Sequence, residues 1–232
     1  MQIEGSRPRG EFTMSGIVVW GGGTPRAMRV YWALEELGLG YEHHLIASRS
    51  GETQTAQFTA LNPRQKIPVL QDDELLLTES GAIVTYLAET YGEAMGLIPP
   101  PGSAARAHYF EWCFFVMTEL DAHTLYVIRR HEGLAQLYGE SKVAAQAARE
   151  YYHKYALVAA DILNDARPYI LGHTFTAADI LLTTTLDWGR GARIEIPAPF
   201  EAYLERVHAR PAHARAGALC YSVRPDGSRV ST

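Results

Sequence analysis

The dipeptide Thr24-Pro25 marks a position where the chain is able to hold an anion. It follows a short apolar run, residues 17–20, and a triplet of glycines. Thr is a preferred helix N-cap and Pro is favoured in the first helical turn, so a helix is expected to begin here. The unpaired N–H groups and the positive dipole end of such a helix favour a nearby anion, including a thiolate.

The chain supplies no thiol of its own at that position. Redox proteins place a Cys-x-x-Cys pair at the start of such a helix, because the helix dipole lowers a cysteine pKa. Here the two cysteines, Cys113 and Cys220, lie elsewhere in the sequence and form no such pair. Thiol chemistry at Thr24 therefore needs a thiol that the ligand brings. So few cysteines are typical of a reducing compartment, and we expect a cytoplasmic protein.

The overall charge disfavours some classes of partner. The 232 residues include 21 Lys and Arg against 26 Asp and Glu, which gives a net charge of −5. Nucleic acids and anionic membranes both reward a basic surface, so neither is expected as a partner. The acidic excess is concentrated in residues 14–95. An anion at Thr24 would therefore have to be bound by local groups and backbone dipoles.

Other patterns give no sign of a binding function. The histidines, among them His208 and His213, have no metal-ligand spacing, so no bound metal is expected. The pair Arg129-Arg130 is interpreted as part of a solvated face. No apolar run approaches the ~18 residues that a membrane helix needs.

The elements that must position Thr24 form a small α/β domain. Apolar runs followed by turn residues predict strands at 17–20, 41–46, 67–70 and 75–78, the last two as a hairpin. Helices are expected to begin at Thr24 and at Ser80, the first ending at Gly38 and the second at Gly92. Residues 58–61 are expected to form a short helix or an irregular segment. The predicted order is thus β-α-β-α-β-β-α.

Everything after a proline-rich spacer has helical patterns. Residues 96–103 contain Pro99-Pro100-Pro101-Gly102 and are interpreted as an interdomain linker. The apolar faces expected to be buried are Tyr109, Trp112, Val116 and Leu120, then Tyr151, Tyr155, Val158 and Ile162, then Phe200, Tyr203, Leu204 and Val207. Thr176 and Asp179 form a capping box, with Phe175 packing on Ile180. The second domain is therefore predicted to be all-helical.

The ends of the chain are expected to lie outside both domains. Residues 1–13 lack the apolar core of a secretion signal and are interpreted as an expression leader, with Met14 as the natural start. The predicted division is 1–13 leader, 14–95 α/β domain, 96–103 linker, 104–222 helical domain and 223–232 tail. The tail is expected to be disordered or foreign.

Four segments in this order resemble the glutathione transferases. Residues 62–70, NPRQKIPVL, and 79–87, ESGAIVTYL, resemble that family's N-P-x-x-K-V-P-x-L and E-S-x-A-I-x-x-Y-L signature. Residues 29–38, RVYWALEELG, resemble its first helix, and 169–180 resemble the capping-box segment of its helical domain. The resemblance covers residues 16–210. It implies a thioredoxin-like N-terminal domain followed by an α-helical domain, with glutathione as the co-substrate.

The resemblance also assigns residues to the parts of glutathione. Pro68 is the expected cis-proline, which exposes the backbone of Ile67 to pair with the cysteinyl part. Glu79 is expected to face the γ-glutamyl ammonium, while the Ser80 hydroxyl meets the γ-glutamyl carboxylate. Lys66 is expected to approach the glycyl carboxylate.

The catalytic position departs from the family pattern. Relatives activate the thiol with a Tyr or Ser hydroxyl, or use a Cys, whereas here Thr24 supplies the hydroxyl at the helix start. It is the candidate catalytic and thiol-contacting residue, although a threonine there is a competent N-cap without any chemistry. Tyr109, Trp112 and Phe115 are candidates for the second-substrate pocket, or else form part of the helical core.

The resemblance implies transfer of the glutathione sulfur to a small hydrophobic electrophile. Glutathione-dependent reduction or isomerisation is another reaction open to this architecture. A cytoplasmic homodimer with a role in detoxification is expected. A different class stays open, a non-catalytic binding or regulatory protein with the same fold, because the site has no tyrosine.

Overall fold

A four-stranded mixed sheet with helices forms the first part of the chain, in the predicted order. The structure, a computed structural model, describes residues 16–165, 167–224 and 226–230. The elements are β1 (Ile17–Trp20), α1 (Pro25–Leu37), β2 (Glu42–His44), η1 (Glu52–Gln54), α2 (Ala56–Leu61), β3 (Val69–Asp72), β4 (Leu75–Thr78), α3 (Ser80–Tyr91) and η2 (Glu93–Met95). The expected leader lies outside the described residues.

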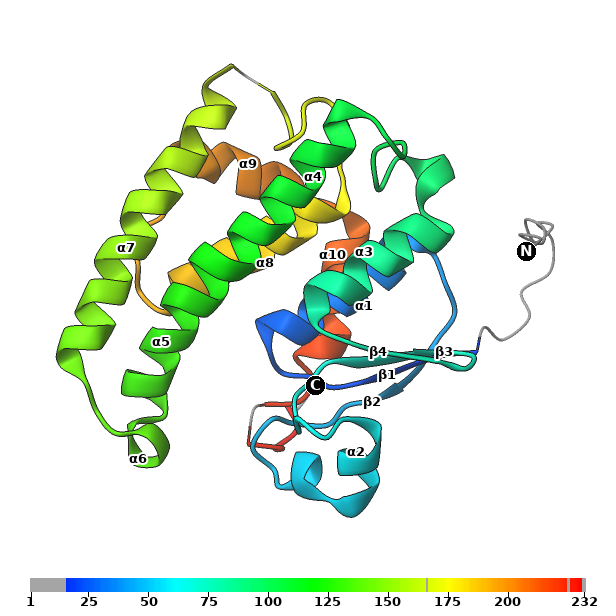
Figure 1. Ribbon diagram of the computed structural model, residues 1–232, viewed down its shortest axis with the longest axis vertical. Helices are drawn as coiled ribbons and strands as arrows, with labels where there is room; N and C mark the ends of the chain where they lie inside the picture. Colours follow the sequence, from blue (N-terminus) through cyan, green and yellow to red (C-terminus); the bar gives the residue numbers. More distant parts are fainter. Residues whose placement is uncertain (1–15, 166, 225, 231–232) are drawn as a thin grey trace.

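The strands run in the spatial order β2-β1-β3-β4. β1 is parallel to β2 and antiparallel to β3, with Trp20 opposite His44 on one side and Val69 on the other. β3 and β4 form the predicted hairpin, in which Val69 faces Thr78. α1 and α3 lie together on one face of this sheet (Figure 1). This is a thioredoxin-like arrangement.

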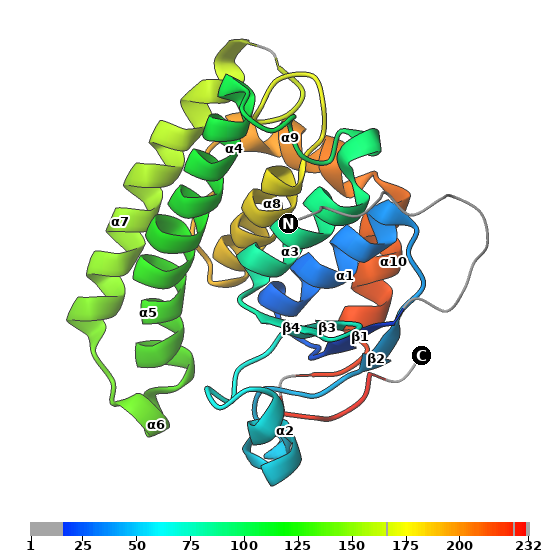
Figure 2. The same cartoon turned by 45° about the vertical axis from the view of Figure 1, so that its right-hand side comes forward.

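The helix α1 is buried on more than one face. Thr24 caps it, Pro25 opens it, and Gly38 ends it in the left-handed conformation with φ of 63°. All of residues 27–34 are buried, including Arg29. The cause lies far along the chain, since α8 and α10 pack on α1 in addition to α3. Figure 2 shows α10 beside α1.

Helices make up nearly all of the second part of the chain. A continuous helical rod consists of α4 (Ala104–Phe115), the π-helical segment η3 (Val116–Leu125), α5 (Tyr126–Ile128) and the π-helical segment η4 (Arg129–Gly133). The rest comprises α6 (Ala135–Tyr138), α7 (Lys142–Ala160), η5 (Asp161–Asp165), α8 (Ala177–Gly191), α9 (Pro199–His208) and α10 (Pro211–Cys220). Within the described ranges, no helix is both long and apolar enough to cross a membrane.

The predicted buried face of α7 is wrong. Val158 is 62% exposed, while Tyr151 and Tyr155 are half-buried and stack on each other. The buried side consists mostly of alanines together with Tyr152. These small residues let neighbouring helices approach, and a Cβ at Gly189 of α8 would come within 2.5 Å of the Tyr152 hydroxyl. A pattern based on large apolar residues therefore selected the wrong side.

The described part of the expected tail makes contacts with the rest of the chain. Val223 is 2% exposed, and its bridge to Arg229 closes a small hairpin. A Cβ on Gly22 would lie 2.6 Å from Val223 Cγ1. The glycine after β1 therefore leaves the room in which the tail packs.

Candidate active site

Three short segments meet at the carboxyl end of β1. They are the glycine turn before Thr24, the Ile67-Pro68 step and the start of α3 at Glu79-Ser80. The Ile67–Pro68 peptide bond is cis, as the family resemblance implies. Gly21 has φ of 126°, and a Cβ there would lie 2.8 Å from Ile67 Cβ. Only glycine fits this close approach and this conformation, so the first two segments touch.

Thr24 acts as the N-cap of α1. Its Oγ1 accepts a hydrogen bond of 3.2 Å from the backbone N–H of Ala27, and its carbonyl accepts one of 3.0 Å from Met28. Pro25 has no N–H. Neither cap bond uses the N–H of Arg26 in the first turn. The helix start therefore presents its positive end together with a threonine oxygen that the cap already engages.

Glu79 and Ser80 open α3 in an unusual geometry. Glu79 has φ of 70°, a left-handed conformation that costs a non-glycine residue about 1–3 kcal/mol and is found mainly at functional sites. Its carboxylate is exposed and forms an ion pair of 3.0 Å with Arg64. Ser80 is buried, and its Oγ accepts a 3.0 Å hydrogen bond from Arg29 Nη1. Because that bond uses a lone pair, the Ser80 hydroxyl keeps its hydrogen for another acceptor.

Arg29 belongs to a buried ionic group that the sequence analysis missed. Its Nη2 lies 2.7 Å from Asp121 Oδ2, and Arg26 pairs with the same carboxylate. Arg29 and Asp121 are 0% and 1% exposed. Burial raises the pKa of Asp121, but the charges and hydrogen bonds of the two arginines more than offset it, so the pKa lies below its usual range. Asp121 is therefore ionised, and it ties the helical part to α1.

Tyr126 is the second group that the sequence analysis missed. Arg26 Cζ lies 4.6 Å from the centre of its ring, and Lys66 Nζ donates a 3.2 Å hydrogen bond to its hydroxyl. Arg129 and Arg130 lie 5.9 and 6.0 Å from the ring centre. The prediction of a solvated face for these two arginines is thus wrong for Arg129, which is half-buried beside Tyr126.

These cations change the acidity of the phenol. Burial raises the pKa of Tyr126, but the Lys66 hydrogen bond and the nearby Lys66, Arg129 and Arg26 charges reverse this, so the pKa is lowered. Little in the sequence indicated that Arg26 and Tyr126 would meet. Arg26 follows the Thr24-Pro25 motif directly, but Tyr126 stands 100 positions further on, and no local pattern joins the two.

The three aromatic candidates for a second-substrate pocket contact core residues. Tyr109 is completely buried and its hydroxyl lies 2.9 Å from Thr85 Oγ1 in α3. Trp112 meets Phe115 edge to face. Phe115 packs against the ring of Tyr155 on α7. These are contacts between packed side chains, whereas the ring of Tyr126 contacts Arg26, which lies two positions after Thr24.

Neither cysteine is suited to replace a ligand thiol. Cys220 Sγ lies 3.7 Å from the Thr24 carbonyl oxygen, close to the helix start. Burial raises the pKa of Cys220 to about 12, and burial does the same for Cys113. A buried thiol with such a pKa is inert at neutral pH.

One group of residues has the composition of a metal site. Asp187, His208 and His213 bring their ligand atoms within 4.8 Å of one another, which is the grouping found in the described part of the chain. His208 Nε2 already makes a 3.0 Å hydrogen bond with Asp187 Oδ2. The spacing of His208 and His213 gave no hint of this, because Asp187 comes from another helix.

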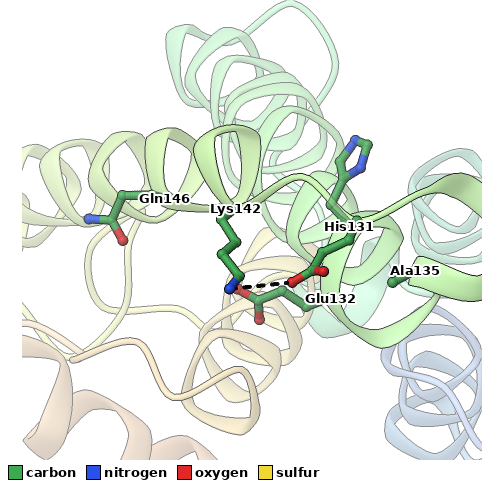
Figure 3. A pocket seen from close by; sticks show the side chains of 6 residues that line it. His131, Glu132, Ala135, Lys142 and Gln146 are labelled. Carbon is green, nitrogen blue, oxygen red and sulfur yellow. Dashed lines mark ion pairs between the residues drawn. The ribbon is translucent and has the colours of Figure 1, made fainter.

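Two hollows lie away from Thr24. One of about 490 Å³ is lined by His131, Glu132, Ala135, Glu140, Lys142 and Gln146. Figure 3 shows it, with the 3.9 Å ion pair between Lys142 and Glu140 as the dashed line. The other, of about 300 Å³, includes Phe175 and Arg210 in its lining. Neither contains any residue predicted to bind glutathione.

The comparisons with known proteins agree on one family. The glutathione S-transferase N-terminal domain family matches residues 14–89. Glutathione S-transferase GstB of Escherichia coli K12 is 40% identical over 100 residues, 41% of this chain and 48% of GstB. The chain thus spans about half the length of that relative. Glutathione S-transferase GstA of Escherichia coli O157:H7 is 31% identical over 162 residues, 66% of this chain and 73% of GstA.

A solved structure extends the likeness to both parts of the chain. The theta class glutathione S-transferase of Xanthomonas axonopodis pv. citri, which has glutathione bound, is 28% identical with a TM-score of 0.75. The match covers 88% of this chain and 97% of that protein. Together with the cis-proline and the start of α3, these likenesses show that the chain belongs to the glutathione transferase family.

Proposed function

We propose that the protein binds glutathione and transfers its sulfur to a small electrophile. The observation that carries the proposal is the meeting of the α1 start, the cis Ile67–Pro68 step and the α3 start at one place. Two helix N-termini and the backbone beside a cis-proline suit a ligand with one thiol and two carboxylates. The family likeness supports the same reading.

Each part of glutathione has a partner in this proposal. The γ-glutamyl carboxylate accepts from the Ser80 hydroxyl, which Arg29 polarises from its other side. The γ-glutamyl ammonium faces Glu79, and the cysteinyl backbone pairs with Ile67. Lys66 approaches the glycyl carboxylate, and its hydrogen bond to Tyr126 fixes the side chain near that end.

The sulfur lies at the start of α1 in this proposal. The helix dipole and the first-turn N–H of Arg26, which neither cap bond uses, stabilise the thiolate, so the thiol proton passes to solvent at a lower pH. Thr24 Oγ1 accepts the cap bond from Ala27 and keeps its hydrogen for the thiolate, so in this proposal Thr24 assists the backbone N–H groups. The thiolate then forms a C–S bond with the electrophilic carbon, and the leaving group departs with the electrons of the broken bond.

The finer expectations belong to the same proposal. We propose a cytoplasmic homodimer with a role in detoxification and no bound metal or nucleic acid. Phe114 of α4 is 67% exposed and Leu76 of β4 is 40% exposed, which are apolar side chains that a partner subunit would cover. Light scattering that gives a mass near the 25.7 kDa of one chain would contradict the dimer.

Titration calorimetry with glutathione tests the binding site. A hydrogen bond to a charged group contributes about 1.5–3 kcal/mol, so Ser80→Ala should weaken binding about ten-fold or more. Ser141→Ala is the control, because Ser141 is a serine at another helix start, where it caps α7. Unchanged affinity in both Ser80→Ala and Glu79→Ala would overturn the assignment.

The second candidate function is glutathione binding without catalysis. The residue type at this position favours it, because Thr24 stands where relatives activate the thiol with a Tyr or Ser hydroxyl or use a Cys. The pH dependence of thiolate absorbance near 240 nm separates the two. A transferase should lower the pKa of bound glutathione, and Thr24→Ala should remove only part of that shift. Absence of any shift in the unaltered protein would favour the non-catalytic candidate.

A further inference from the structure

The positive charge around Tyr126 exceeds what the neighbouring carboxylates neutralise. Asp121 is shared by Arg26 and Arg29, so one negative charge serves two positive charges. Glu79 is engaged by Arg64. Lys66 contacts the Tyr126 hydroxyl, which is neutral in its protonated form. A ligand that brings a negative charge would therefore be favoured at this place.

The pKa of Arg129 also reflects this surplus of positive charge. Burial lowers the pKa of Arg129, and the like charge of Arg49 lowers it further, as does that of Arg26. A guanidinium that is disfavoured by two neighbouring cations gains most from an added anion. Its planar donors suit a carboxylate in particular.

The surplus faces the position proposed for the reacting sulfur. Arg26 lies in the first turn of α1, just after Thr24, and Lys66 directly precedes Ile67. Both side chains reach the ring of Tyr126, so this ring lies close to both segments that flank the position proposed for the cysteinyl part. Arg129 and Arg130 approach the same ring from the helical rod.

We propose that the second substrate is an organic acid with an electrophilic carbon, rather than an uncharged apolar compound. Its carboxylate binds among Arg26, Arg129 and Arg130, its carbon skeleton lies on the Tyr126 ring, and its reactive carbon meets the sulfur. This inference rests on the proposed glutathione transfer. With a 2-halo acid, the thiolate forms the C–S bond as the carbon–halogen bond breaks, and halide leaves with the bonding electron pair.

The test compares two inert products that differ in one charge. S-carboxymethylglutathione carries the acid, and S-carbamoylmethylglutathione carries an uncharged amide of the same size, so both share every glutathione contact. Titration calorimetry should give about ten-fold tighter binding of the acid, as expected for one charge-assisted contact. The preference should shrink at high salt, since the arginines are partly exposed.

Two single variants assign the preference to its residues. Arg129→Gln should reduce the acid-to-amide affinity ratio several-fold, and Arg130→Gln provides the same test if Arg129→Gln does not fold. Arg190→Gln is the matched control, because Arg190 forms an exposed ion pair with Glu201 on another surface. The control should leave the ratio unchanged.

The outcomes separate this inference from the proposed function. Equal affinity for acid and amide, with both bound, overturns the organic-acid inference and leaves glutathione binding intact. A preference that survives both Arg129→Gln and Arg130→Gln also overturns it, because the charge is then recognised elsewhere. Failure to bind S-methylglutathione as well as both products overturns the proposed function itself.

Discussion

Two buried aspartates of the helical part have opposite surroundings. Asp121 is 1% exposed and accepts from two arginines of α1. Asp179 is fully buried and accepts from neutral groups, the N–H and hydroxyl of Thr176, the N–H of Ile170 and the hydroxyl of Tyr203. Near-complete burial is thus common to both, and only the charge of the partners differs.

The partners decide the protonation of each acid. For Asp121 the arginines outweigh burial, and the pKa is lowered. For Asp179 burial outweighs the four hydrogen bonds, and the pKa is raised to about 6. Neutral donors therefore only partly replace the water that a buried carboxylate loses, whereas charged donors more than replace it.

The partners also decide what each acid connects. Asp179 lies in the capping box of α8 and holds Ile170, Thr176 and Tyr203, all within the helical part. Asp121 holds Arg29, which contacts Ser80, and Arg26, which contacts Tyr126. The first group stabilises a helix start, and the second links the interface between the two parts to the proposed substrate site.

Removal of the Asp121 charge should produce the largest effect. Asp121→Asn leaves two arginines with no carboxylate, and loss of one partner of a buried ion pair costs about 3–5 kcal/mol. Urea unfolding at pH 7 should show a loss of this size in the free energy of unfolding. Asp187→Asn, at a half-buried acid bonded to His208, should lose much less.

A second substitution checks that the unpaired charge causes the loss. Asp121→Asn combined with Arg29→Met removes both members of the pair and should recover part of the stability. A loss below about 1 kcal/mol in Asp121→Asn alone would mean that the arginines find water or other partners. The charge of the partners would then not account for the contrast with Asp179.

The contacts of Asp121 and those of Asp179 also differ in how far the sequence predicts them. The Thr176-x-x-Asp179 box is local, so its spacing alone identified it, as it did the Thr24-Pro25 start and the β3–β4 hairpin. The contact between Arg29 and Asp121 joins residues 92 positions apart. Only the packing of the helical rod beside α1 creates it, and no periodicity records that packing.

The candidate site was predictable to the same extent. The segments with a local motif, at Thr24, Ile67-Pro68 and Glu79-Ser80, do meet at one place. Tyr126 has no motif, and its importance arises from four cations that the fold gathers around it. The prediction of the buried face of α7 failed for a related reason. Close packing there uses alanines, which a pattern based on large apolar residues does not count.

Stability as a function of pH should separate the two acids. A pKa raised from about 3.9 to about 6 gives stability that is present below pH 3.9 and lost as pH rises through 6. Asn cannot ionise, so the unfolding free energy of the unaltered protein minus that of Asp179→Asn should fall by about 2 kcal/mol between pH 4 and 7.5.

The pH dependence of the same stability difference should have the opposite sign for Asp121→Asn. The lowered pKa of Asp121 gives stability that is present above pH 3.9 and lost only as pH falls below it. The difference should therefore stay flat between pH 4.5 and 7.5 and decrease at lower pH. Parallel slopes for the two variants would show that both acids titrate alike, which contradicts the comparison.

Removal of one neutral donor should give the smallest effect. Tyr203→Phe deletes the 3.1 Å hydrogen bond to Asp179 Oδ1, and one such bond contributes about 1 kcal/mol of unfolding free energy. Because that bond also lowers the pKa of Asp179, its loss should raise the pKa and shift the upper edge of the pH window upward. Carboxyl NMR titration measures the shift directly. Tyr152→Phe, whose hydroxyl bonds the Thr185 carbonyl instead, should lose similar stability and leave the Asp179 titration in place. An equal shift in both variants would mean that Asp179 responds to general loosening of the core, and that its four neutral donors do not set its pKa individually.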